Sequence, residues 1–191
     1  MMRFSYVLPD PAGYPSSSFE ADVASVKQAG YEAVELQIAD PLAFDRKGVV
    51  RVLKRYELPL CGFQTGASYG THGNCLCTAN AAVRRRTTEL LKRFADLAAE
   101  LKAVMVVGSL QGRLKDEPDR DAGAARIAEA LREAGTQATR AGAVIAFEPV
   151  NETARTTGWS TSVLPTAPPR PVTRLKTPLG RPASCSAWAS R

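Results

Sequence analysis

The sequence is poor in the residues that build metal and disulfide frameworks. It has one histidine, His72, and four cysteines, Cys61, Cys75, Cys77 and Cys185, among 191 residues. The cysteines form no Cys-x-x-Cys pair, which is a spacing that structural zinc sites commonly use. We therefore expect neither a zinc site nor a disulfide framework, and we interpret the cysteines as reduced, partly buried thiols.

The chain also lacks long apolar runs and nucleotide-binding motifs. No N-terminal stretch has the pattern of a signal peptide, and no run reaches the roughly 18 apolar residues of a membrane span. These absences predict a cytoplasmic protein with no membrane partner. No Gly-x-Gly-x-x-Gly or P-loop motif follows an apolar segment, so a nucleotide-binding domain lacks its most specific support.

Acidic residues are scarce only at one end of the chain. The net charge is +6, and residues 152–191 contribute +5 of it, from six basic residues and one acidic residue. Residues 1–151 hold 19 basic and 18 acidic residues. Because this larger part is close to neutral, its charge gives no electrostatic reason to expect a nucleic-acid partner.

Short apolar runs alternate with helical patterns over the first 150 or so residues. The predicted strands are residues 3–8, 32–38, 58–65, 103–109 and 143–148, and the valine-rich run 103–109 is typical of a strand buried on both faces. The predicted helices are residues 18–30, 44–56, 79–101 and a segment through 127–138. This alternation predicts parallel βαβ units, either in an open doubly wound sheet or in part of an eight-stranded barrel.

The length decides between these two architectures only in part. A complete (β/α)8 barrel needs about 250 residues. The five predicted units have the number of residues per unit that such a barrel has, but the chain is too short for eight of them. We predict the α/β class and a partial (β/α)8 TIM barrel with about five parallel strands and outer helices in residues 1–151. Residues 152–191 contain six prolines and no apolar periodicity, which predicts a disordered C-terminal tail.

The tail also differs from the body in composition. It is rich in Arg, Pro, Ala, Thr, Ser and Gly, as out-of-frame translation of a GC-rich gene tends to be. We favour a truncated or frameshifted coding sequence after about residue 151 over a natural tail.

Polar side chains follow each predicted strand, at the edge where function collects in parallel α/β proteins. The candidates are Gln37, Asp40, Gln64, Thr65, Ser109, Gln111, Arg113, Glu148 and Asn151. Glu148 follows an apolar run and precedes a proline, which places its carboxylate at the mouth of the sheet. Such a carboxylate can bind a divalent metal or abstract a proton next to a carbonyl. A salt-bridged glutamate at a strand end is the alternative.

The segment FEPVN, residues 147–151, resembles the Glu-Pro-x-Asn segment of the sugar isomerase and epimerase superfamily with xylose isomerase-like barrels. The stretches AGYEAVELQ (29–37), TANAAVRRRTTELLKRFADLAAEL (78–101) and VMVVGSLQG (104–112) are similar to that family in order and spacing. The resemblance covers about residues 3–151. It implies a sugar phosphate isomerase or epimerase fold, in a superfamily that includes ketose 3-epimerases, hydroxypyruvate isomerases and inosose dehydratases.

The resemblance also implies a chemistry and a site. It implies a Mn²⁺- or Mg²⁺-dependent enzyme that acts on a small sugar or sugar phosphate by proton transfer next to a carbonyl. It assigns Glu148 to the first metal ligand and to the proton transfer. We expect Gln64, Ser109 and Asn151 to contact the substrate.

The family's later metal ligands have no counterpart in this sequence. After Glu148 the chain has no aspartate, no histidine and only one further glutamate, and we place His72 in an exposed loop after the third strand. We therefore expect an incomplete metal site and an inactive fragment. The alternative is a non-catalytic remnant or binding module with the same fold. The apurinic endonuclease branch uses a histidine-rich three-metal site, and a single histidine argues against it.

Overall fold

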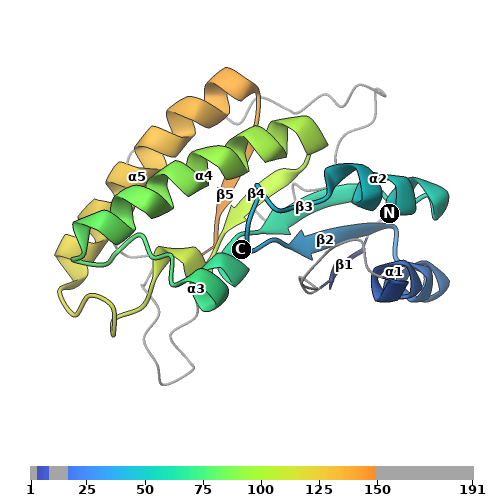
Figure 1. Ribbon diagram of the computed structural model, residues 1–191, viewed down its shortest axis with the longest axis horizontal. Helices are drawn as coiled ribbons and strands as arrows, with labels where there is room; N and C mark the ends of the chain where they lie inside the picture. The colour runs from blue at the N-terminus through green and yellow to red at the C-terminus, as the bar shows by residue number, and fades with distance from the viewer. Residues whose placement is uncertain (1–3, 9–16, 149–191) are drawn as a thin grey trace.

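The computed structural model describes residues 4–8 and 17–148, which form a five-stranded parallel sheet with strand order β1-β2-β3-β4-β5 (Figure 1). The strands are β1 (Ser5–Leu8), β2 (Ala33–Gln37), β3 (Leu60–Gln64), β4 (Val104–Val107) and β5 (Val144–Phe147). The helices are α1 (Ser17–Gln28), α2 (Arg46–Arg55), α3 (Gly66–His72), α4 (Ala81–Leu101) and α5 (Arg120–Ala141), with a short 3-10 helix η1 (Ser109–Gln111). The predicted α/β class and five parallel strands are confirmed.

The predicted tail, residues 152–191, and Asn151 lie outside the described residues. The division of the chain at residue 151 therefore stays a prediction. Among the described helices, none combines the length and the apolar content that crossing a membrane requires.

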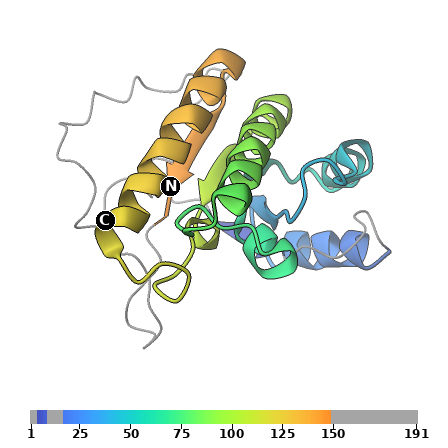
Figure 2. The same ribbon diagram turned by 60° about the vertical axis from the view of Figure 1, so that its left-hand side comes forward.

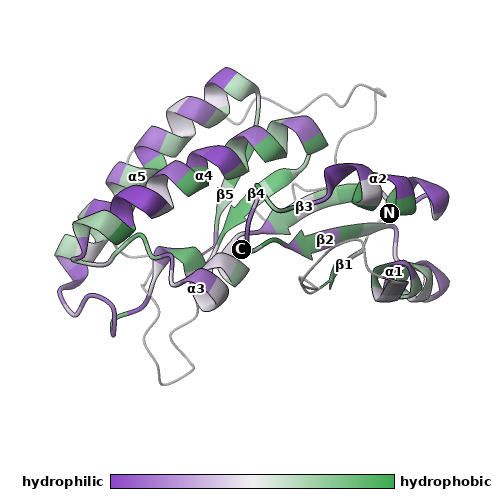
Figure 3. Ribbon diagram, in the orientation of Figure 1, coloured by the Kyte–Doolittle hydropathy of each residue, from purple (hydrophilic) through white to green (hydrophobic). Residues whose placement is uncertain are grey.

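The helices pack on one face of the sheet because the strand order is sequential and such crossovers share one hand. Figures 1 and 2 show α4 and α5 side by side across β4 and β5. Leu8, Leu36, Phe63 and Met105 stand in one row across the first four strands and are all buried. Phe63 contacts Phe94 of α4, with ring centroids 5.9 Å apart. The apolar core thus lies between the sheet and the helices. In Figure 3 the strands are mainly hydrophobic, whereas much of the helices is hydrophilic.

The opposite face of the sheet, which we call the inner face, is less buried. The expectation that β4 is buried on both faces is wrong. Met105 and Val107 are buried on the helix side, whereas Val104 and Val106 are only half-buried. No described helix packs on the inner face, so these valines keep part of their surface in contact with solvent.

The sheet ends at β1 on one side and at β5 on the other in the part that the structure describes. Although the β5 segment is apolar in sequence, no residue of β5 is fully buried. Tyr6 of β1 is 43% exposed and Val144 of β5 is 36% exposed. Edge strands lack a neighbouring strand on one side, so their side chains are more exposed to solvent and some of their backbone groups have no partner strand.

The sequence patterns did not predict α3. His72 was expected in a loop, but it is the last residue of this helix and is exposed. The helix contains glycines at positions 66 and 70, which are poor helix formers. It is held instead by tertiary contacts: Asn74 Nδ2 donates to Ser68 Oγ at 2.8 Å, and Tyr69 Oη donates to an Asp116 carboxylate oxygen at 2.8 Å.

Candidate functional site

A cavity of about 240 Å³ lies at the C-terminal edge of the sheet. It is lined by Gln37, Gln64, Gly66, Ala67, Gly108, Ser109 and Glu148. Three of the four predicted site residues, Gln64, Ser109 and Glu148, therefore share one cavity. The fourth, Asn151, lies outside the described residues.

The position of Glu148 follows from the pairing of β4 with β5. Val107 pairs with Phe147, so Gly108 and Glu148 lie side by side just past the strand ends. The Glu148 amide donates to the Val107 carbonyl at 3.0 Å. A Cβ atom at position 108 would lie 3.0 Å from Glu148 Oε2, which is tighter than nine in ten real Cβ contacts. Glycine at this position therefore leaves room for the carboxylate over the end of β4.

Gln111 holds the same strand end from below the cavity. Its side chain is fully buried, and Nε2 donates to the Gly108 carbonyl at 3.0 Å and to the Glu148 carbonyl at 3.2 Å. Its Oε1 atom is buried without a hydrogen-bond partner among the described residues. Gln111 thus positions the backbone of Glu148. Its place after β4 made it a candidate in the sequence, but this role needs the β4–β5 pairing to be known.

The neutral donors of the cavity come from three strand ends. Gln37 and Gln64 are paired in register across β2 and β3, on the inner face. Ser109 follows β4 as the first residue of η1, and a Cβ atom at Gly66 would lie 3.3 Å from Ser109 Cβ. The first residues of α3 and η1 are therefore in close contact beside the cavity.

The other candidates from the strand ends do not line the cavity. Asp40 accepts a hydrogen bond from the Leu42 amide at 2.8 Å and so caps a turn. Thr65 is fully buried, and its hydroxyl donates to the Val106 carbonyl at 3.1 Å. Arg113 lies over the Tyr69 ring, with its guanidinium carbon 5.4 Å from the ring centroid.

The described lining does not complete a site for Mn²⁺ or Mg²⁺. Hard divalent cations take about six oxygen ligands in proteins, with carboxylates among them. Among the described residues of the cavity, Glu148 offers the single carboxylate, and Gln37, Gln64 and Ser109 add neutral oxygens only. This donor set can contribute one charged ligand to such an ion.

Residues 23–164 match the protein family described as Xylose isomerase-like TIM barrel. The chain belongs to this family. The match includes β2 to β5 and therefore all four strands whose ends carry the cavity, so the predicted superfamily is confirmed.

Individual relatives agree with this fold. The chain is 27% identical over 141 residues to a ketose 3-epimerase from Arthrobacter globiformis. The aligned region covers 72% of this chain and 47% of that protein. The chain thus spans about half the length of the curated relative that it matches.

Two solved structures are similar in fold. One is a D-allulose 3-epimerase from Methylomonas sp. in complex with D-allulose, with a TM-score of 0.60, 19% identity, and coverage of 78% of this chain and 52% of that one. The other is a family 2 AP endonuclease from Brucella melitensis, with a TM-score of 0.61, 19% identity, and coverage of 80% and 57%. At such low identity these two structures bear on the fold alone.

Proposed function

We propose that the cavity binds a small sugar or sugar phosphate and that Glu148 transfers a proton at the carbon next to the sugar carbonyl. The observation that carries this proposal is the convergence of one carboxylate, two amides and one hydroxyl, from Glu148, Gln37, Gln64 and Ser109, around one cavity. Sugars need such alternating donors and acceptors, and a carboxylate at hydrogen-bond reach can act as a general base. The 27% identity to a ketose 3-epimerase supports a ketose as the substrate class.

In the proposed reaction, Glu148 accepts the proton when the C–H bond breaks. The electron pair of that bond moves to the carbonyl oxygen and leaves an enediolate. The Ser109 hydroxyl and the Gln64 amide are the groups that can donate hydrogen bonds to this oxyanion, a kind of interaction that is commonly worth about 10²–10³ in rate. Transfer of the proton from Glu148 to the neighbouring carbon gives an isomer, whereas an epimer requires a second acid that protonates the original carbon from its opposite face.

The family relationship implies a divalent metal that polarises the sugar carbonyl when it is bound. Glu148 is the residue of the described cavity that would hold it. Because the remaining described donors are neutral, we propose that metal binding by this chain depends on Glu148 and is weaker than a site with several carboxylates would give.

A second candidate function is a sugar-binding module without turnover. The single carboxylate among the described lining residues favours it, because epimerisation requires an acid or base on each face of the reacting carbon. Both candidates use the same cavity, and they differ in whether the C–H bond of the sugar is broken.

The test is a calorimetric titration with D-allulose and with Mn²⁺, combined with exchange of the sugar's carbon-bound hydrogen in D₂O. As an enzyme, the chain exchanges this hydrogen, and Glu148→Ala lowers the exchange rate by about 10²–10⁴. Asp40→Ala is the matched control, because it removes a carboxylate that caps a turn outside the cavity.

The other outcomes are distinct. Sugar binding that is lost in Gln64→Ala, without any exchange, supports the binding module. Mn²⁺ binding that is lost in Glu148→Ala and kept in Asp40→Ala supports the proposed ligand. A wild-type chain that binds neither sugar nor Mn²⁺ contradicts both candidate functions.

A further inference from the structure

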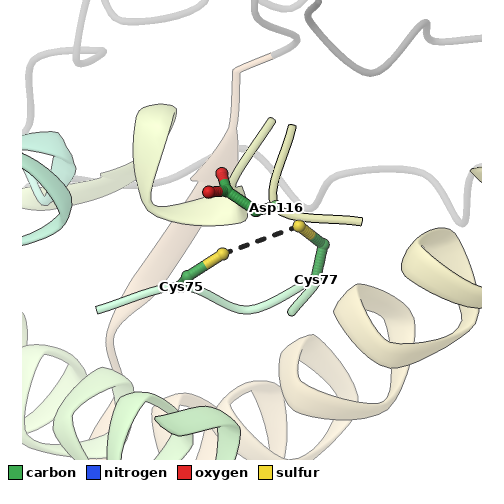
Figure 4. A group of neighbouring side chains, drawn as sticks. All are labelled: Cys75, Cys77 and Asp116. Carbon is green, nitrogen blue, oxygen red and sulfur yellow. Dashed lines mark hydrogen bonds between the residues drawn. The ribbon is translucent and has the colours of Figure 1, made fainter. Parts of the chain in front are cut away.

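Two cysteines and an aspartate meet next to η1, although the sequence contains no Cys-x-x-Cys zinc pattern. Cys75 and Cys77 lie between α3 and α4, and Asp116 lies between η1 and α5 (Figure 4). Their ligand atoms all lie within 4.8 Å of one another. Cys75 is 5% exposed, Cys77 is fully buried and Asp116 is half-buried.

The two sulfur atoms have the separation that a shared tetrahedral ion requires. Zinc–sulfur bonds of about 2.3 Å at tetrahedral angles place two sulfurs about 3.8 Å apart. The Sγ atoms of Cys75 and Cys77 are 3.6 Å apart. The Cys-x-Cys spacing therefore brings both thiols to one point without any change of the backbone.

The backbone around the cluster is fixed by the neighbouring loop. The Leu76 amide donates to the Leu110 carbonyl and the Cys77 amide donates to the Gln111 carbonyl, each at 3.1 Å. The Cys75 amide donates to the Thr87 hydroxyl at 3.0 Å. The cysteine segment is thus tied both to η1, which carries Ser109, and to α4.

Asp116 is oriented as a metal-binding carboxylate commonly is. Its Oδ2 atom accepts hydrogen bonds from the Tyr69 hydroxyl and from the Arg113 amide, both at 2.8 Å. Outer hydrogen bonds of this kind fix the direction of a ligand and sustain its affinity for the ion.

The thiols are suited to a soft divalent ion. Thiolate ligands select zinc, whereas magnesium and manganese bind oxygen ligands. When zinc binds, two S–H bonds break, two Zn–S bonds form and the two protons pass to the buffer.

We propose that Cys75, Cys77 and Asp116 form a zinc site, with two thiolates and one carboxylate as ligands and a fourth position for water. The site is separate from the cavity that contains Glu148. Its ion would fasten the loop after α3 to the loop after β4, and so hold the wall that carries Ser109.

The experiment uses the full chain in a Cys61→Ser/Cys185→Ser background, which leaves only the proposed pair of thiols. Cys61 lies in β3, where its Sγ atom contacts the Val34 carbonyl at 3.3 Å, and Cys185 is outside the described residues. We expect one zinc per chain in a competition titration with a chromophoric chelator. Adding Cys75→Ser and Cys77→Ser should weaken binding by at least 100-fold, and Tyr69→Phe by about 10-fold.

A second readout does not depend on the folding of variants with buried substitutions. Cobalt bound to the intact background chain should show thiolate-to-cobalt charge-transfer absorption, with two protons released per ion. Less than one equivalent of zinc, no charge-transfer band, or unchanged affinity after both cysteine substitutions would overturn the proposal.

Zinc binding should persist in Glu148→Ala. Conversely, Mn²⁺ binding in the cavity should persist in Cys75→Ser/Cys77→Ser. The two proposals therefore fail or succeed independently.

Discussion

Replacing Gly112 by alanine should destabilise the protein in two ways, through backbone strain and through crowding against the two cysteine thiols. This residue has φ +94° and ψ −172°, a combination that is almost restricted to glycine and costs other residues about 1–3 kcal/mol. A Cβ atom there would lie 2.4 Å from Cys77 Sγ and 2.5 Å from Cys75 Sγ. Both thiols are buried, so relieving the overlap costs about 1–3 kcal/mol more, as overpacking typically does. We expect Gly112→Ala to lower the free energy of unfolding by about 2–6 kcal/mol.

The assay is urea unfolding followed by circular dichroism, in the wild type and in a Cys75→Ala/Cys77→Ala background. In that background the crowding is gone, so Gly112→Ala should cost only the backbone part, about 1–3 kcal/mol. Gly135→Ala is the matched control, because this glycine lies in α5 with no atom within 4 Å of the added Cβ. It should stabilise the protein by about 0.5–1 kcal/mol. An equal cost of Gly112→Ala in both backgrounds would refute the crowding argument.

Two further predictions concern charge. The hydrogen bond from Arg126 is the main cause that lowers the pKa of Glu117, so this carboxylate stabilises the fold above its ordinary pKa and loses that effect as the pH falls through the lowered value. Wild type should therefore exceed Glu117→Gln in urea midpoint near neutral pH and converge with it in acid, and a difference that is constant with pH contradicts this. Tyr6→Lys and Val144→Lys should each reduce aggregation in light scattering, because they place a charge on exposed edge-strand positions, and unchanged aggregation would show that the edges do not drive association.

Much of the fold follows from patterns that are local in the chain. The five strands are short, mostly apolar segments of four to five residues, and the long helices α4 and α5 begin after the side-chain caps Asn80 and Asp119. Helix α3 escaped prediction because its stability comes from contacts with residues distant in sequence, such as that of Tyr69 with Asp116. The low helix propensity of glycine predicts a loop for this segment, but tertiary contacts stabilise a helix instead.

The cavity at the strand ends could be predicted from the sequence to a larger extent than the proposed zinc site. That Gln64, Ser109 and Glu148 lie around one cavity could be predicted, because the C-terminal ends of parallel strands meet at one edge of the sheet. The meeting of Cys75 and Cys77 with Asp116 was not predicted, because Asp116 belongs to a different loop, between η1 and α5. The role of Gln111 was missed for a related reason, since its partners are backbone carbonyls of β4 and β5 ends.

The sequential strand order has a consequence for how the chain is made. Ser5 pairs with Ala33, and Val104 pairs with Val144, so each new strand finds its partner in the unit synthesised just before it. Loop closure over such short separations costs little entropy. Growth of the sheet can therefore follow the ribosome from the N-terminus, and each added βα unit shelters the apolar edge left by the last while exposing a fresh one.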